Sequence, residues 1–286
     1  MILFRRIRMK KFKTLLFAPV PLFLAIAFQF VAVFYLLFLA AIFMFGIAPS
    51  VNGQSYGIND LIELTANMDF NTIISIVFSV FCIAFFAIWY YKSYGGNFKI
   101  DVKKAFHPLE ILGIILLVPG AQFMSSILTG MISMAFPQWL EDYMNLIENA
   151  GLSGEVSPLM MIYSVCLAPI SEELIFRGVT YRIARKAFPF WVANFIQAVL
   201  FGIFHMNPLQ GCYTFVLGLF MGYICEKGGS LYHAILFHFL FNLWGTTASE
   251  WLLVGDEPPQ GLIIIFGTII GLTGGLCFFK KGNQLK

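Results

Sequence analysis

Long, continuous apolar runs separated by short polar stretches make up nearly the whole chain. Eight runs approach or exceed the roughly 20 apolar residues that a helix needs to cross the hydrocarbon core of a membrane. They cover residues 15–45, 72–91, 109–135, 158–181, 190–206, 211–226, 230–249 and 260–279. Because apolar residues follow one another without alternation, the runs predict helices and not membrane strands. The sequence therefore predicts an all-α, polytopic membrane protein with about eight transmembrane helices.

The positions of the basic residues support this number of spans. All 18 Lys and Arg residues lie before the first run, between the second and third, at or after the end of the fourth, between the sixth and seventh, or after the eighth. With eight spans, these positions share one side of the membrane. The loops of the other side contain acidic residues but no Lys or Arg. The positive-inside rule makes the basic side the cytoplasm. Both termini are expected there, in a protein integral to a bacterial cell membrane.

Composition narrows the class of protein further. The chain is 59% hydrophobic and only 12% charged, whereas soluble domains are about 45–50% apolar and about 25% charged. The surplus apolar surface must face lipid. A net charge of +3 gives no indication of a nucleic-acid partner. The five cysteines are scattered through apolar segments without metal-type spacing and are expected to be small buried hydrophobes.

The costly polar residues within the spans are concentrated in one part of the chain. Ionisable groups inside spans usually face the bundle interior and mark function. The residues of this kind, with one amide as a polar companion, are Glu172, Glu173, Arg177, His205, His233, His238 and Asn242. Their distribution predicts an N-terminal scaffold of three spans (1–157), a catalytic core of four spans (158–249), and a C-terminal span with a cytoplasmic tail (250–286). His233, near the cytoplasmic end of its span, is expected to have a packing or interfacial role.

Spacing within the fourth span separates two adjacent glutamates. Glu173 and Arg177 are four residues apart, so they share a helix face and can form an ion pair. Glu172 lies about 100° away around the helix and needs another partner. The pair alone is equally compatible with a purely structural ion pair that locks helix packing.

The histidine-bearing segments show the same spacing of four. Phe201 shares a face with His205, and His238 shares a face with Asn242. Each pair alone is typical of hydrogen bonding between membrane helices. Combined with Glu172, however, they provide the groups needed for hydrolysis. A glutamate with a histidine can activate water, and a histidine with an amide can stabilise the oxyanion formed at a peptide carbonyl.

A metal is a second way to use these residues. Carboxylate and imidazole are good zinc ligands, so Glu172, His205 and His238 are candidate ligands. No HExxH motif is present, and a zinc site would have to be assembled across helices. Water activated by Glu172 and His205 without metal is the preferred hypothesis, and zinc stays open as a cofactor.

The three motifs together resemble those of the CPBP family (CAAX proteases and bacteriocin-processing enzymes, also called the Abi family) of intramembrane proteases. The family pattern EExxxR, FxxxH and HxxxN or HxxxD reads here as EELIFR (172–177), FGIFH (201–205) and HFLFN (238–242). The resemblance covers roughly residues 158–248. It implies an intramembrane endopeptidase in which Glu172 and His205 activate water, His238 and Asn242 hold the oxyanion, and Glu173 and Arg177 support the site.

The resemblance also implies the kinds of partner. Family members act on peptides or on lipidated, prenylated proteins within the membrane, and some are tied to bacteriocin immunity. The family is often labelled as metalloprotease, although a metal-free glutamate mechanism is also proposed for it. The alternative reading is a non-catalytic membrane immunity or binding protein of the same family. A transporter or channel is disfavoured because the sequence shows no internal repeat.

Overall fold

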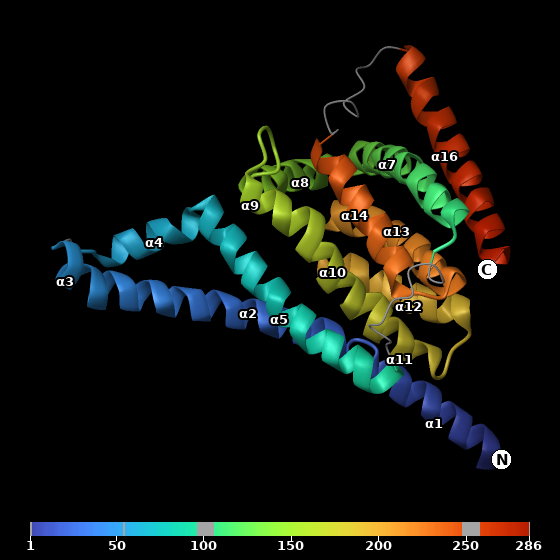
Figure 1. Ribbon diagram of the computed structural model, residues 1–286, viewed down its shortest axis with the longest axis horizontal. Coiled ribbons are helices and arrows are strands. Elements are labelled where there is room, and N and C mark those ends of the chain that lie inside the picture. The colour runs from blue at the N-terminus through green and yellow to red at the C-terminus, as the bar shows by residue number, and fades with distance from the viewer. Residues whose placement is uncertain (1, 54, 96–105, 248–257, 286) are drawn as a thin grey trace.

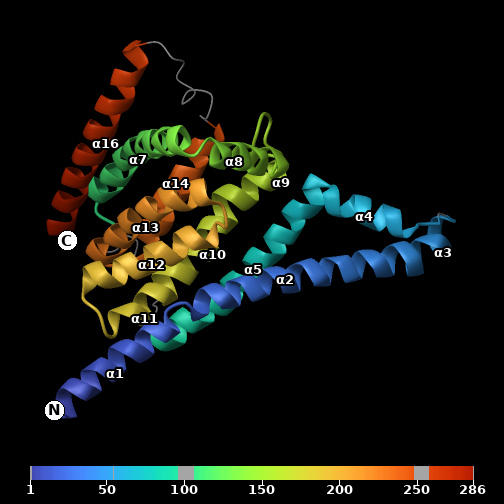
Figure 2. The ribbon, with the colours of Figure 1, turned by 180° about the vertical axis from the view of Figure 1, so that it is seen from behind.

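The computed structural model describes residues 2–53, 55–95, 106–247 and 258–285. Helices form all of the regular secondary structure within those ranges, and no strand occurs there. The helices build a bundle with one extended arm (Figures 1 and 2). The all-α, polytopic architecture predicted from the sequence is therefore confirmed. The basic residues Lys99, Lys103 and Lys104, and the acidic residues Glu250, Asp256 and Glu257, lie outside the described residues.

Helices occupy all eight predicted apolar runs, although two are shorter than the others. In the described ranges, six helical segments are long and apolar enough to cross a membrane: Ile7–Ile47, Met68–Tyr94, Pro108–Ala135, Pro158–Arg185, Pro208–Gly228 and Gly261–Gln284. The two shorter ones are α12 (Phe190–Phe204), with 15 residues, and α14 (Leu231–Thr247), with 17 described residues. The count of eight crossings, and the side on which the termini lie, stay predictions.

The arm of the molecule is formed by the N-terminal helices. The first apolar run is overlong, and it breaks between α1 (Ile2–Phe17) and α2 (Val20–Ala41) at Pro19, as its length and prolines predict. Proline favours a break because it removes a backbone donor and clashes with the preceding turn. The chain continues through the π-helix η1 (Ile42–Ile47), α3 (Ala48–Asn52) and α4 (Ile58–Ala66). Then α5 (Met68–Tyr94) returns along α2 to the bundle (Figure 1).

Two long helices at the opposite edge of the bundle pack through glycines. In α7 (Pro108–Ala135) and α16 (Pro258–Gln284), a Cβ on Gly113 would lie 2.8 Å from the carbonyl oxygen of Gly275. A Cβ on Gly120 would approach Leu272 N to 2.7 Å. On α16, Gly271 and Gly275 face the backbone of α7, whereas Gly274 faces open space. Small residues of this kind let membrane helices approach closely.

Helices also occupy polar stretches between the predicted runs. One is α4, between the first and second runs, and another is α8 (Pro137–Asn149), between the third and fourth. Its period-3.6 pattern, with Trp139, Tyr143, Leu146 and Ile147 among acidic neighbours, makes it amphipathic. It is too short and too polar to be read as a span.

The fourth span is a helix with two π-helical insertions. It consists of α9 (Pro158–Met161), η2 (Ile162–Leu167), α10 (Ala168–Glu173), η3 (Leu174–Thr180) and α11 (Tyr181–Arg185). π-Helical turns are rare and often occur at functional sites. Here they flank the segment that carries Glu172 and Glu173, so this helix departs from regular α geometry on both sides of the motif.

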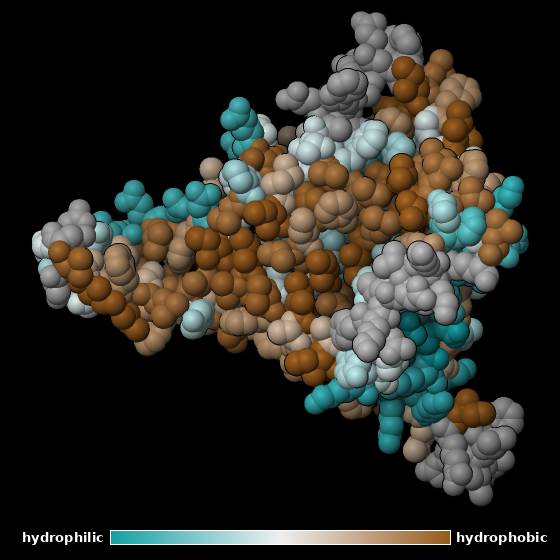
Figure 3. All heavy atoms as spheres, viewed as in Figure 1, coloured by the Kyte–Doolittle hydropathy of each residue, from teal (hydrophilic) through white to brown (hydrophobic). Residues whose placement is uncertain are grey.

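The remaining helices complete the bundle around this span. A short turn at His205–Asn207 joins α12 to α13 (Pro208–Gly228), and α14 follows after Gly229. In that turn Met206 adopts φ 53°, an unusual value for a residue other than glycine. The space-filling view shows an apolar band across the molecule, with hydrophilic patches beyond it toward the end of the arm and toward the basic helix ends (Figure 3).

Candidate active site

A cavity of about 560 Å³ lies inside the bundle. Its wall includes Glu172, His205, His238 and Asn242, the four residues predicted to be catalytic, together with Phe201. The fourth span, α12 and α14 contribute these residues, while α2, α5, α8 and α13 complete the wall. The structure thus brings together residues that are up to 70 positions apart in the chain, around one space large enough for part of a peptide.

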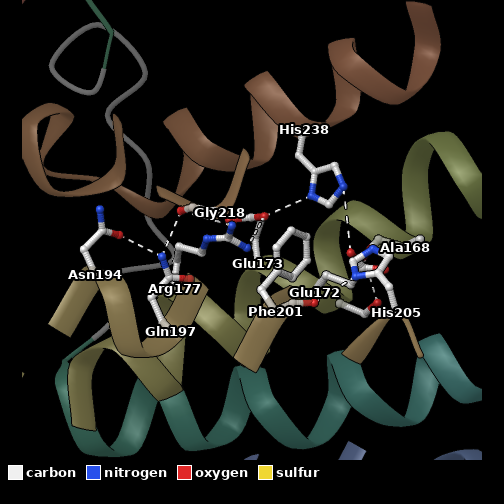
Figure 4. A network of polar contacts seen from close by, with 11 residues as sticks. Ala168, Glu172, Glu173, Arg177, Asn194, Gln197, Phe201, His205, Gly218 and His238 are labelled. Atoms are coloured by element: carbon white, nitrogen blue, oxygen red, sulfur yellow. Dashed lines mark hydrogen bonds and ion pairs between the residues drawn. The ribbon is translucent and has the colours of Figure 1, made fainter. Parts of the chain in front are cut away.

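The ion pair predicted between Glu173 and Arg177 is confirmed. Arg177 Nη1 donates to Glu173 Oε1 over 2.9 Å, and both side chains are fully buried. The same carboxylate oxygen lies 2.9 Å from Nδ1 of His238 (Figure 4). Since a carboxylate can only accept, Nδ1 of His238 carries the proton in this contact. Glu173 therefore fixes both the orientation of the His238 ring and the position of Arg177.

Glu172 faces the cavity from the other side of the same helix. Its side chain is 13% exposed, and Oε2 lies 3.8 Å from Nε2 of His238. His238 therefore lies between two carboxylates, one in close contact and one at a longer distance (Figure 4). When His238 is protonated, the charges of Glu172, Glu173, Arg177 and His238 sum to zero. A balanced set is the arrangement expected for buried charges, because an unpaired one is costly to desolvate.

His205 is oriented by its own helix. As the C-cap of α12, its Nδ1 lies 2.8 Å from the backbone carbonyl oxygen of Phe201. A carbonyl only accepts, so Nδ1 bears the hydrogen, and Nε2 of the neutral ring is left with a lone pair. The ring of Phe201 contacts it edge-on with centroids 4.8 Å apart. The unprotonated nitrogen is thus held in an orientation suited to accept a proton or hydrogen bond.

Asn242 makes a contact that the sequence did not predict. Its Nδ2 donates to the backbone carbonyl oxygen of Ser164 over 2.8 Å. In the π register of η2, Ala168 N–H bonds to Tyr163 O, so the donor due to Ser164 O would be residue 169. That residue is Pro169, which has no N–H. Asn242 supplies the missing donor, and its second amide hydrogen is left for other use.

Arg177 is supported on several sides. Its guanidinium carbon lies 4.3 Å from the centre of the Phe201 ring, a favourable cation–π geometry. Nη2 lies 3.5 Å from the carbonyl oxygen of Gly218, which also accepts from Gln197 Nε2 at 2.8 Å. Gln197 in turn donates to Asn194 over 2.7 Å (Figure 4). Sequence reasoning did not single out Gln197 or Asn194, although both are amides inside an apolar run.

The candidate zinc ligands do not assemble into a metal centre in this arrangement. Within the described ranges, no three His, Cys, Asp or Glu side chains converge in a way that could hold a metal ion. His238 uses Nδ1 for Glu173, and His205 uses Nδ1 for a carbonyl. These contacts leave Nε2 of each ring available, as in zinc-bound histidines, so it is the placement of the side chains and not their chemistry that does not match a three-ligand zinc site.

A second buried polar contact lies away from the cavity. Nε2 of His233 is 3.4 Å from Oε2 of Glu110, and both side chains are fully buried. His233 also packs between the rings of Phe106 and Phe279, with centroid separations of 4.5 and 5.8 Å. The packing role predicted for His233 is confirmed. Glu110 was read as a residue at the edge of its span, and its burial depends on tertiary contacts that the sequence does not reveal.

Comparison with known proteins bears on the same region. Residues 154–244 match the model of the family described as Type II CAAX prenyl endopeptidase Rce1-like. Over 85 residues the chain is 28% identical to "Putative membrane peptidase YdiL" of Bacillus subtilis (strain 168), an alignment covering 30% of this chain and 35% of that protein. Residues 154–244 are therefore similar to the CAAX prenyl endopeptidase family that the motifs resemble.

The matched region contains every residue of the three motifs, and it includes the fourth span, α12, α13 and α14, which supply most of the cavity wall. The alignment spans only about a third of the length of the curated relative. No solved structure matched the chain. The helices outside residues 154–244, among them α2, α5, α7 and α16, are therefore described here from their own sequence and contacts.

Proposed function

We propose that this chain is an intramembrane endopeptidase that hydrolyses a peptide bond of a membrane-associated peptide or lipidated protein. One observation carries the proposal. Glu172, His205 and His238 line one cavity within the apolar part of the bundle, and His238 is held by the buried Glu173–Arg177 pair. A structural ion pair alone would not need a cavity large enough for part of a peptide beside it. The family match and the peptidase relative support the same class of activity.

The reaction follows from the chemistry of these groups. Glu172 and Nε2 of His205 accept a hydrogen bond from a water molecule, and Glu172 takes its proton as the oxygen attacks the peptide carbonyl carbon. In this proposal Nε2–H of His238 donates to the resulting oxyanion, and the second amide hydrogen of Asn242 is the other donor. The proton on Glu172 then passes to the leaving nitrogen as the C–N bond breaks. The products are a carboxylate and an amine.

Glu173 and Arg177 support this chemistry without touching the substrate. Glu173 keeps Nδ1 of His238 protonated and fixes the ring, while Arg177 balances the charge of Glu173. Phe201 holds both Arg177 and His205 through its ring and its carbonyl. The proposed steps use only these groups of the chain.

The test is hydrolysis of internally quenched, apolar fluorescent peptides by the purified protein in detergent or lipid. Glu172→Gln removes the proposed base with little change in shape, and the rate should fall by about 10²–10⁴, the usual contribution of general-base catalysis. Glu63→Gln in α4, an exposed position of the arm away from the cavity, is the matched control and should retain activity. Full activity in Glu172→Gln would refute its role as base. An inactive wild type that binds the peptides would favour the non-catalytic alternative.

A further inference from the structure

The cavity extends from the candidate catalytic residues mainly toward one end of the bundle. On the fourth span, Glu172 lies midway between Pro158 and Lys186, and the cavity wall includes Met160, Tyr163, Ser164 and Ala168 but no residue after Glu172. Residues 173–181, which include Glu173 and Arg177, are buried and do not line the cavity. On this helix the cavity therefore opens toward its N-terminal end.

Neighbouring segments show mostly the same direction. From α5 the wall receives Ser75 and Phe78, which lie in the half that begins at Met68. From α14 it receives Phe237 and His238 near the middle of the helix, and Phe241 and Asn242 in the half remote from Leu231. On α2, by contrast, the wall residues 26, 29 and 30 lie in the half that begins at Val20. Most of the wall therefore lies toward the end of the bundle that carries α8 and the α12–α13 turn.

That end differs in charge from the other. The opposite helix ends carry Lys92, Arg182, Arg185, Lys186 and Lys227, and none of these lines the cavity. At the open end, Asp69, Glu148 and Glu155 surround a second hollow that shares Ala150 and Met160 with the cavity wall. No Lys or Arg occurs at that end among the described residues. By the positive-inside rule, the open end is the extracytoplasmic one.

The amphipathic helix α8 borders this opening. Its apolar face contributes Leu146 and Ile147 to the cavity wall. The hydroxyls of Tyr143 and Tyr213 lie 3.3 Å apart, which ties α8 to α13 beside the cavity. A helix lying over the opening with its apolar face inward is a suitable contact for an apolar peptide that arrives along the membrane surface.

We propose that the cavity receives its substrate from the face opposite to the basic residues, beneath α8, so that the cleaved bond belongs to a membrane-bound peptide exposed on the extracytoplasmic side. This deepens the proposed function and rests on it. A lipidated C-terminus in the cytoplasm would meet the basic end of the bundle, where Glu173 and Arg177 close the site. The substrate class is therefore an exported or membrane-inserted peptide with its scissile bond near the outer surface.

Labelling with a charged, membrane-impermeant maleimide tests the direction without requiring catalysis. Gln210→Cys places a thiol in the cavity wall near α8, Lys186→Cys marks the basic end, and Phe195→Cys, on the exposed face of α12, reports lipid. The unaltered chain, with its five cysteines, gives the background. Gln210→Cys should be labelled in right-side-out vesicles and Lys186→Cys in inverted ones. Phe195→Cys should stay at background.

The outcomes separate this inference from the proposed function. Labelling of Gln210→Cys from the same side as Lys186→Cys would overturn the direction of entry, whatever the enzyme cleaves. In a second arm, the quenched peptides are added outside right-side-out or inverted vesicles of wild type. Hydrolysis in right-side-out vesicles supports the inference, and hydrolysis confined to inverted vesicles contradicts it. Outer labelling without hydrolysis in detergent would leave the direction standing and reject the peptidase.

Discussion

A single oxygen of Glu173 lies 2.9 Å from Nδ1 of His238, and the same oxygen accepts a hydrogen bond from Arg177. This relationship links the buried ion pair of the fourth span to the histidine of α14. Glu173 is thus more than a counter-ion for Arg177, because it also sets which nitrogen of His238 carries a proton. The adjacent Glu172, only 3.8 Å from the other ring nitrogen, occupies the cavity side.

The two glutamates should respond differently to the same substitution. Glu173→Gln removes the charge that balances buried Arg177, and stranding a buried charge costs about 3–5 kcal/mol. We expect a lower unfolding temperature and a low peptidase rate, since His238 also loses its acceptor. Glu172→Gln should unfold near the wild-type temperature and be inactive. Thermal unfolding in detergent, measured beside hydrolysis, checks both, and equal stability of the two variants would contradict the assignment.

Asn242 should have separable structural and catalytic roles. Asn242→Leu leaves the Ser164 carbonyl without a donor, at a cost of about 1–3 kcal/mol. Pro169→Ala restores the backbone N–H that would donate to the Ser164 carbonyl in the π-helical register, so the double variant should regain part of the lost stability. The peptidase rate should stay low, because the second amide hydrogen is still missing from the oxyanion. Recovery of both stability and rate in the double variant would show that Asn242 acts only on the helix.

Two neighbouring glycines of α16 provide a matched pair. Gly275→Leu would drive a side chain into the backbone of α7 at Gly113, whereas Gly274→Leu would enter open space. Overpacking typically costs about 1–3 kcal/mol, and here the obstacle is backbone that cannot rotate away. We expect Gly275→Leu to reduce the folded yield and unfolding temperature while Gly274→Leu behaves as wild type. Similar behaviour of the two variants would mean that α7 and α16 do not pack as described.

The charge of the open end should appear in substrate preference. Asp69, Glu148 and Glu155 lie near the opening and no basic residue is described there. A quenched peptide with Lys beside its apolar segment should therefore have a lower KM than the same peptide with Glu. Raising the salt to about 1 M, where the Debye length is about 3 Å, should reduce the difference. A preference for the Glu peptide would contradict the proposed route of entry.

Sequence reasoning found the spans and the motif residues because each depends on local spacing. The Glu173–Arg177 pair follows from helical spacing, and it forms even though η3 begins between the two residues. The contact between His238 and Glu173 joins residues 65 positions apart and depends on how two spans pack. No local pattern predicts it.

Other features stayed hidden for different reasons. The π-helices η2 and η3 leave no plain signal in composition, because the same apolar residues suit both helix types. The helix α8 is amphipathic and short, so a search for long apolar runs passes over it. The contact of Asn242 with Ser164 depends on one of these hidden elements, the π-helix η2, and on the proline that follows it. The sequence shows the amide but not its acceptor.

The short helix α12 has a consequence for the lipid around the protein. At about 1.5 Å per residue, its 15 residues extend about 22 Å, less than the roughly 30 Å of a typical hydrocarbon core. With α12 as the predicted fifth span, we expect the lipid beside it to thin to match it, and His205 would cap the end where the membrane surface is drawn inward. The water consumed in hydrolysis then has a shorter path to the site. Bilayers of longer acyl chains should slow turnover by withdrawing that supply, even where every side chain keeps its place.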